Sequence, residues 1–440
     1  MSTEPHRLTA TEALQAFENG SLTIEDYAKS ILKHIEARDA IVKAWAYLDP
    51  AQVLEQARAL DSVPKGERGP LHGVAVAIKD VIYTKGMPTQ FNSPIYANDQ
   101  PEVDGASVIM LHKAGALILG KSRTTEFAAT TDGPGTTNPH GTSRTPGGSS
   151  SGSAAAVADF QAPLGLGTQT GGSMIRPGSF NGVYAIKPTW NSVSREGQKI
   201  YSINLDTLGW YARSIEDLEL LGSVFGIEDD EAPQPPKAGV KGLKFAFCKS
   251  MVWDEAGPGT RNAMQKGMEL LKAHGADVEE ITLPHDFDKL PDWHTCILSG
   301  DGRTSFRADY QASKDKMAAF LVEHVENVQN YTRKDYLEAF DGISALRPKW
   351  DAIAEKYAAV VIPSVPDEAP QGMHTGNPVF NSWTTALHIP VVNVPGFQGE
   401  NGMPVGLTLA APRYADQALL AVAKEVGKVW EKEGGWISKL

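Results

Sequence analysis

Short, uninterrupted apolar runs are the feature that most constrains how this 440-residue chain can fold. The clearest are GVAVAIKDVI at 73–82, ALILG at 116–120, AAVVIP at 358–363 and MPVGLTLAAP at 403–412. Runs of this length without polar alternation are typical of strands buried on both faces. DGASVIMLHKAG at 104–115 has helical spacing and lies between the first two. This alternation of helix and strand predicts an α/β protein.

The chain divides by pattern into a helical start and a larger remainder. Residues 1–65 are expected to form a helical segment packed on the core, with Thr11 and Thr23 as helix caps because acidic residues follow each. Residues 66–440 are expected to form one domain. The polar, proline-rich stretch within 227–242 lacks periodicity and predicts a linker inside that domain.

The charge and the cysteine content limit the partners and the cellular compartment that we expect for the chain. The formal net charge of −12 argues against nucleic acid or an acidic membrane surface as the main partner. Two cysteines, Cys248 and Cys296, make neither a disulfide framework nor a metal cluster, which favours a reducing compartment. The start lacks an apolar signal region, and no apolar run reaches the ~18 residues that span a bilayer. We therefore expect a cytoplasmic protein without a metal or cofactor.

Two motifs resemble known catalytic patterns without their context. GALILGKS at 115–122 fits a phosphate-binding loop, but the residues between its glycines are themselves the apolar strand. GSSSG at 148–152 fits a nucleophile elbow around Ser150, which must follow a buried strand. Polar residues and two prolines precede it. An acid and a histidine would have to follow; His374 or His388 could serve, but neither lies in a distinctive context. A strand and a serine-rich turn are the simpler interpretations.

TQTGGSMIRP at 168–177 is a stronger candidate for a nucleophile. Ser173 follows two glycines at the end of an apolar stretch. Glycines allow successive backbone N–H groups to point into one cavity, as an oxyanion hole requires. The donors would come from Thr170, Gly171, Gly172 and Ser173. From this segment alone, a glycine turn with a capping serine is the better explanation of the pattern.

A serine nucleophile needs a base, because a free hydroxyl is a poor nucleophile. Lys79 ends the apolar run at 73–82. A lysine drawn into such an interior is desolvated, which lowers its pKa and frees the amine to accept a proton. The alternative is that Lys79 pairs with Asp80 or extends out of the sheet end.

Taken together, these segments resemble the amidase signature family. The resemblance extends from about residue 70 to the C-terminus and is weakest between 226 and 375. The matching segments are GVAVAIKDVIYTKGMPT (73–89), NPHGTSRTPGGSSSGSAAAVA (138–158), GTQTGGSMIRPGSFNGVYAIKPTW (167–190), LDTLGWYARSIEDLELL (205–221) and MPVGLTLAAPRYADQALLAVA (403–423).

The resemblance implies a fold and a set of catalytic residues. The family fold is a single α/β domain, in which helices cover both faces of one large mixed sheet. The family's Ser–cis-Ser–Lys triad maps onto Lys79 as the base, Ser149 as a bridging serine after a cis peptide bond, and Ser173 as the nucleophile. The 24 residues that separate Ser149 and Ser173 are the family's usual spacing.

Two departures from the common pattern resemble the malonamidase-like branch. Gln169 stands where many members have Asp, and Arg176 comes three rather than two residues after Ser173. The resemblance implies that Arg176 binds a substrate carboxylate, with Gly148 and Ser150 also in the substrate site. The alternative is that Arg176 only braces the loop through backbone carbonyls.

The function implied is hydrolysis of the C–N bond of a small linear amide, with carbamates and esters as further substrates. The alternatives are the glutaminase (A) subunit of a tRNA-dependent amidotransferase and a non-catalytic interaction protein on the same scaffold. Expected partners are a small-molecule amide and water, with no nucleic acid, no membrane, and a homodimer as one oligomeric option. Cys296, close to His294, suggests a thiol nucleophile, but nothing in the sequence around it offers an oxyanion hole. Trp383 is expected in the core.

Overall fold

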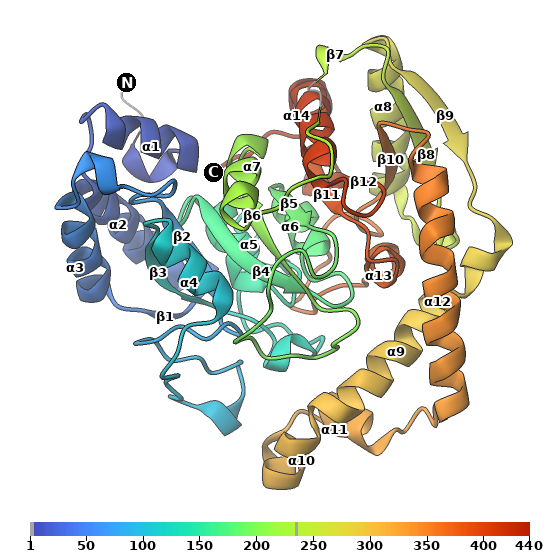
Figure 1. Cartoon of the computed structure of the whole chain (residues 1–440), viewed down its shortest axis with the longest axis horizontal. Helices are drawn as coiled ribbons and strands as arrows, with labels where there is room; N and C mark the ends of the chain where they lie inside the picture. The colour runs from blue at the N-terminus through green and yellow to red at the C-terminus, as the bar shows by residue number, and fades with distance from the viewer. Residues whose placement is uncertain (1–3, 234–235) are drawn as a thin grey trace.

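One large sheet forms the centre of the molecule. The computed structural model describes residues 4–233 and 236–440. Its sheet has eleven strands in the order β1-β3-β2-β4-β6-β5-β11-β12-β10-β8-β9 (Figure 1). β2 pairs in parallel with β3 and β4, β8 pairs in parallel with β9 and β10, and the remaining pairs are antiparallel. The predicted α/β class with a single mixed sheet is confirmed.

The strands of the chain are β1 (Trp45–Leu48), β2 (Ala75–Lys79), β3 (Leu117–Ser122), β4 (Leu164–Gln169), β5 (Tyr184–Lys187), β6 (Thr207–Ala212), β7 (Lys237–Val240), β8 (Lys244–Cys248), β9 (Asp277–Ile281), β10 (Ala359–Pro363), β11 (Val391–Gln398) and β12 (Pro404–Ala410). The α-helices are α1 (Ala10–Glu18), α2 (Ile24–Val42), α3 (Pro50–Asp61), α4 (Ala106–Lys113), α5 (Ser151–Ala158), α6 (Ile175–Asn181), α7 (Ile215–Val224), α8 (Pro258–Ala273), α9 (Leu290–Ser305), α10 (Arg307–Ser313), α11 (Ala319–Glu326), α12 (Arg333–Ala354), α13 (Val379–Ala386) and α14 (Asp416–Glu433).

Helices cover both faces of the sheet, as the apolar runs require. Along β2, Val76 and Ile78 belong to the apolar core that contains α4, α7, α8 and α14. Ala75 and Ala77 point the other way, into the core built with α2 and α3. Successive side chains of a strand alternate between faces, so a strand covered twice must be apolar at every position. Lys79 follows the same alternation and shares the face of Ala75 and Ala77.

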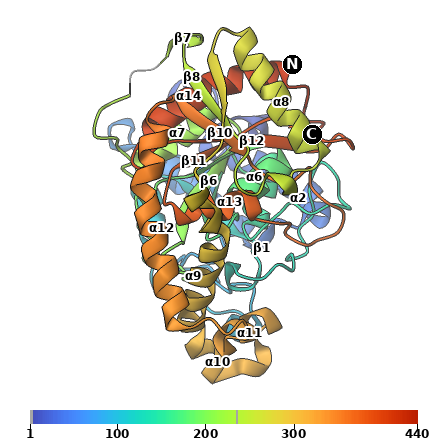
Figure 2. The ribbon, with the colours of Figure 1, turned by 90° about the vertical axis from the view of Figure 1, so that its right-hand side faces the viewer.

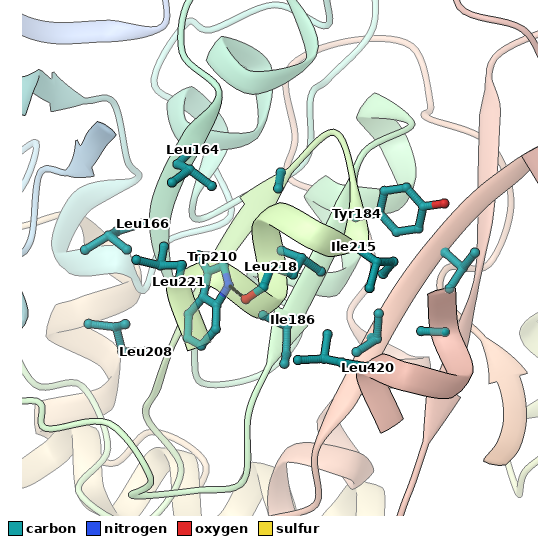
Figure 3. Packing of buried hydrophobic residues seen from close by; sticks show 14 of the residues in the cluster. Leu164, Leu166, Tyr184, Ile186, Leu208, Trp210, Ile215, Leu218, Leu221 and Leu420 are labelled. Atoms are coloured by element: carbon teal, nitrogen blue, oxygen red, sulfur yellow. Dashed lines mark hydrogen bonds between the residues drawn. The ribbon is translucent and has the colours of Figure 1, made fainter. Parts of the chain in front are cut away.

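Packing on the first face is dense around a buried tryptophan (Figure 3). Trp210 of β6 is fully buried, and its indole Nε1 donates to Leu218 O of α7 at 3.1 Å. Leu164 and Leu166 of β4 belong to the same core (Figure 3). A buried indole N–H normally needs such a partner. This core fixes β4, whose carboxyl end leads into the glycine turn.

Helices α9 to α12 form an extension that we call the helical arm, residues 290–354. α9 and α12 pack along one another, and α10 and α11 lie at the far end (Figures 1 and 2). α9 also packs against α11 and α13. The helical arm thus connects a distant tip to elements beside the sheet.

Most predicted elements are present, and the N-terminal segment needs two corrections. Thr9, not Thr11, caps α1: its side chain accepts from Glu12 N, and the Glu12 carboxylate accepts from Thr9 N. Thr23 caps α2 as predicted. β1 was not expected. It pairs with β3 and makes the N-terminal segment part of the same sheet.

The predicted linker at 227–242 is only partly described. Residues 234–235 lie outside the described residues, and β7 occupies 237–240 within the predicted range. No helix in the described ranges combines the length and hydropathy needed to cross a membrane.

Candidate active site

The carboxyl ends of two neighbouring parallel strands bring the predicted residues together. Lys79 is the last residue of β2, and the turn 170–173 directly follows β4. β2 and β4 are adjacent and parallel, so both ends lie at the same edge of the sheet. In α/β sheets this edge is where ligands bind.

Lys79 is fully buried and surrounded by hydroxyl groups. Its Nζ lies 2.7 Å from Ser149 Oγ, 2.9 Å from Ser150 Oγ and 2.7 Å from Thr168 Oγ1. None of these partners carries a charge. Burial therefore lowers the pKa of Lys79 well below its usual value, and the nearby Asp206 carboxylate opposes this only in part.

These contacts suit an uncharged amine, which has two N–H donors and one lone pair. Ser150 Oγ donates to Thr168 O at 3.2 Å and therefore accepts from Lys79. The lone pair can then accept the hydroxyl proton of Ser149. This is the geometry that proton transfer from a serine to a lysine requires.

The alternative partner for Lys79 is engaged elsewhere. Asp80 Oδ1 lies 3.4 Å from the Nζ of Lys121, a buried residue of β3. Lys121 also donates to Ile82 O at 2.7 Å and to Thr89 Oγ1 at 2.6 Å. The segment 115–122 is therefore a strand, as the sequence indicated, and not a phosphate loop. The pairing of its lysine with Asp80 was not expected.

The two other predicted triad residues border one cavity. Ser149 follows a cis Gly148–Ser149 peptide bond just before α5, and Ser173 stands just before α6. The cavity has a volume of about 140 Å³, and its lining includes Ser149, Arg176 and the whole turn 170–173. The structure thus brings the predicted nucleophile, bridging serine and oxyanion turn to a single space.

The carbonyl groups of the turn are held by specific donors. Thr385 Oγ1 donates to Gly171 O at 2.9 Å, and Tyr211 OH donates to Ser173 O at 3.0 Å. In a trans peptide the N–H points opposite to the C=O. A carbonyl fixed by the protein therefore also fixes the direction of the next N–H group. Such preorganised donors suit a developing oxyanion.

Two side chains that the sequence did not identify as functional contact the predicted site residues. Asp206 Oδ1 accepts from Thr170 Oγ1 at 2.6 Å, and Asp206 Oδ2 accepts from Tyr201 N at 2.8 Å. Burial raises the pKa of Asp206 to about 6. Thr168 contributes its hydroxyl to Lys79. Both residues lie inside the motifs that carried the resemblance, which was the available signal.

The contacts of Gln169 explain why a glutamine, and not the more common aspartate, fits at this position. Its Oε1 accepts from Met174 N at 2.9 Å and from Ile175 N at 3.1 Å, while its Nε2 donates to Thr385 Oγ1 at 3.0 Å. The last contact requires a donor, which a carboxylate lacks. Gln169 thus joins the first turn of α6 to the residue that holds Gly171 O.

Arg176 is buried and only partly hydrogen-bonded. Its Nη2 donates to Gly148 O at 2.6 Å, the bracing contact that one interpretation expected. Its Nε and Nη1 have no partner among the described residues. Burial lowers the pKa of Arg176 only to about 10, so the side chain remains charged at neutral pH. Two donors of a cation are thus available beside the cavity.

The remaining candidates occupy structural positions. Ser150 and Gly148 are absent from the cavity lining, and Ser150 Oγ contacts Lys79 Nζ. The substrate role of both residues stays a prediction. Residues 123–147, all described, contain no strand that leads into the 148–152 segment, which removes the basis for a nucleophile elbow. Burial raises the pKa of Cys296 to about 11, which disfavours a thiolate. Trp383 is buried in the core against Trp350.

No group of three or more His, Cys, Asp and Glu side chains in the described ranges is arranged to hold a metal ion.

The chain is similar in sequence and in fold to proteins of one known family. The Amidase family model matches residues 26–420. The A subunit of glutamyl-tRNA(Gln) amidotransferase from Acidothermus cellulolyticus is 33% identical, over 98% of this chain and 95% of that protein. Its counterpart from Chloroflexus aggregans is 31% identical, over 99% and 98%. A crystal structure of an amidase superposes with a TM-score of 0.86 at 29% identity, covering 96% of this chain and 99% of the other.

These relatives correct one expectation. The sequence predicted a small-molecule amide and water as partners, with no nucleic acid, no membrane and a homodimer as an option. That prediction is contradicted, because the curated relatives are subunits of an enzyme named for glutamyl-tRNA(Gln). The error has a physical cause: a net charge of −12 sums over the whole surface and says little about a local contact or a partner subunit.

The family model covers most of the chain, and relatives and solved structures of amide-cleaving enzymes span nearly its full length. The chain is therefore an enzyme of the hydrolase and amidotransferase type that acts on amide C–N bonds, and it belongs to the Amidase family, the amidase signature enzymes.

Proposed function

We propose that this chain cleaves an amide C–N bond through an acyl-enzyme on Ser173. The observation that carries the proposal is the 2.7 Å contact between Lys79 Nζ and Ser149 Oγ, made where no carboxylate among the described residues forms an ion pair with the lysine. A neutral amine held against a serine hydroxyl is a base ready to receive a proton.

Protons are conserved in each step of the reaction. Ser149 passes its proton to Lys79 and takes the proton of Ser173 as Ser173 Oγ attacks the amide carbon. The resulting oxyanion accepts hydrogen bonds from N–H groups of the turn 170–173. The protonated Lys79 returns its proton through Ser149 to the leaving nitrogen, which departs as a neutral amine or ammonia. Water then attacks the ester by the same relay and releases the acid and Ser173.

Arg176 supports a substrate that carries a carboxylate. Its Nε and Nη1 have no protein partner among the described residues, and the buried cation borders the cavity. A buried donor without a partner is costly unless a ligand supplies one. The substrate class we propose is a small linear amide with an acid group.

Arg176→Gln tests this carboxylate contact. We expect kcat/KM for an acid amide such as malonamate to fall by about 100-fold, while its neutral methyl ester changes little, because a charged hydrogen bond contributes about 1.5–3 kcal/mol. Equal rates for the acid and its ester in the wild type, unaltered in Arg176→Gln, would overturn the carboxylate contact.

A second function concerns the fate of the nitrogen. The relatives named as A subunits of glutamyl-tRNA(Gln) amidotransferase match nearly end to end. This favours glutamine as the amide, with the released ammonia passed to glutamyl-tRNA(Gln) in a complex with a further subunit. Both functions share the cleavage steps above. A cytoplasmic location, expected from the sequence, fits either.

The test is ammonia release by the purified chain, with Ser173→Ala as the blank. Acid amides including glutamine, neutral amides and carbamates form the substrate set. Cleavage by the wild type alone supports the free-amide hydrolase. Glutamine cleavage that requires both glutamyl-tRNA(Gln) and a co-purifying subunit supports the amidotransferase. Ammonia release that persists in Ser173→Ala contradicts the proposed chemistry, and no release under any condition supports a non-catalytic scaffold.

A further inference from the structure

One face of helix α9 meets the candidate active site. His294, Leu298 and Asp301 are spaced by four and three residues and therefore share a side of the helix. Leu298 lines the cavity. Asp301 Oδ2 accepts from Ser202 Oγ at 2.5 Å, and Ser202 lies in the same loop as Asp206. The helical arm thus contacts the site through several side chains of one helix face.

His294 makes the contact closest to the oxyanion turn. Its side chain is buried, and its Nε2 lies 2.8 Å from Thr170 O. Burial lowers the pKa of His294 to about 4, so the ring is neutral at pH 7. A carbonyl oxygen only accepts, so the Nε2 atom must carry the proton and donate it. The contact is therefore a directed hydrogen bond.

This bond fixes one particular peptide plane. In a trans peptide, holding Thr170 O sets the direction of Gly171 N–H. The next two planes of the turn are set from elsewhere: Thr385 Oγ1 holds Gly171 O at 2.9 Å, and the backbone N–H of residue 176 holds Gly172 O at 3.0 Å. Only the first plane of the turn depends on the helical arm. A glycine at position 171 would rotate readily without that restraint.

We propose that His294 is a positioning residue of the amide-cleaving site, whose hydrogen bond to Thr170 O aims Gly171 N–H at the oxyanion. This inference rests on the proposed function. It gives the helical arm two roles. The arm forms a wall of the cavity, and it holds one oxyanion donor in the orientation that stabilises the transition state. No chemistry occurs at the imidazole, and its proton stays on Nε2 throughout.

The test compares three substitutions at this position. His294→Phe keeps a planar ring but removes the donor. His294→Gln keeps a donor of similar reach, and His294→Asn keeps a donor that is too short to reach Thr170 O. We expect kcat to fall by about 10- to 100-fold in His294→Phe and His294→Asn, less than the loss on removing an oxyanion donor itself, with KM within about twofold. His294→Gln should recover most of the loss.

His34→Phe is the matched control. His34 Nε2 also contacts a backbone carbonyl, Asp159 O at 2.6 Å, but away from the turn. Its loss should leave kcat unchanged. If His294→Phe does not fold, the comparison of His294→Gln with His294→Asn decides the question.

The outcomes separate the two proposals. If the wild type cleaves amides and His294→Phe or His294→Asn keeps the wild-type kcat, the positioning role is wrong and the proposed function stands. The role is also wrong if all three substitutions lower kcat equally, or if only KM changes. Wild-type protein that cleaves no amide, alone or with a partner subunit, overturns the proposed function first.

Discussion

At the scale of single residues, the chemistry depends on a lysine that has only hydroxyl partners. Lys79 is drawn inside by the apolar run that precedes it, and Asp80, its neighbour in sequence, is neutralised by Lys121. Asp80 therefore pairs with another lysine, and burial, opposed only in part by Asp206, lowers the pKa of Lys79. In the proposed mechanism, Ser149 relays the proton between this amine and Ser173, which borders the same cavity.

The pH dependence of the reaction follows from this environment. The pKa of Lys79 is lowered below 10.5, so the active, unprotonated form becomes populated as the pH rises through a value below 10.5. We expect kcat/KM to increase with pH over this range and then level off. In Lys79→Met, this rising limb of the pH profile should disappear together with most of the activity.

Lys187→Met provides the control for that profile. Lys187 is likewise fully buried, with a pKa lowered to about 7, but its Nζ donates to Pro188 O and Ile389 O rather than to the serines. Lys187→Met should therefore keep the rise of kcat/KM with pH. A profile that is unchanged in Lys79→Met, or lost in Lys187→Met, contradicts the assignment of Lys79 as the base.

Sequence reasoning reached some of these residues and missed others for a physical reason. Lys79 and Ser173 stand out because each carries a local signal, an apolar run or a pair of glycines. Thr168 and Asp206 lie within recognisable segments, yet their roles depend on contacts across the sheet. His294 lies in a helix far along the chain, and only the tertiary fold brings it to Thr170.

At the scale of elements, the helical arm bounds the substrate cavity. Leu298 from α9 and Phe320 from α11 both line it. Phe320→Ala should open this wall. We expect kcat/KM for an amide with a longer apolar acyl group to rise by about 10-fold relative to a small acid amide, since each added methylene contributes about 0.8 kcal/mol when buried.

The control for this change is Leu337→Ala on the same arm. Leu337 of α12 is 59% exposed and is not part of the cavity lining. It should leave the ratio of the two rates unchanged. A ratio that does not move in Phe320→Ala would show that the arm does not limit acyl size.

Elements with a continuous pattern were predictable, and short strands beside the turns were not. The helix expected at 104–115 is observed as α4 (Ala106–Lys113), because its apolar spacing is unbroken. β5 and β6 were missed: they are only four and six residues long, and they are defined by pairing with each other and with β4 and β11. Strand pairing of this kind depends on partners distant in sequence.

At the scale of the whole molecule, β1 and the start of α1 are two of the places where the N-terminal segment joins the body. β1 extends the sheet, and the buried Asp217 of α7 accepts from Ala10 N at 2.8 Å and Thr11 N at 2.9 Å. Asp217 thus satisfies N–H groups at the start of α1 that would otherwise have no partner. The division at residue 65 remains our proposal, for a segment that packs on the core and shares its sheet.

Asp217→Ala tests this attachment. We expect it to lower the free energy of unfolding by about 1–3 kcal/mol and to speed hydrogen exchange in α1, because buried donors lose their acceptor. Glu216→Ala, one residue earlier and paired at the surface with Lys424, is the control and should change neither. Equal exchange rates in both variants contradict the anchoring role.

The central claim is that Ser173 forms the acyl-enzyme, and mass spectrometry of the rapidly quenched enzyme tests it most directly. With a cleavable amide or its ester, we expect an added acyl mass on the peptide that contains Ser173 and none in Ser173→Ala. The adduct should accumulate more slowly in Lys79→Met and Ser149→Ala, because both lose the relay. An acyl group found on Ser150 or Cys296 instead, or turnover that persists in Ser173→Ala, would contradict the account.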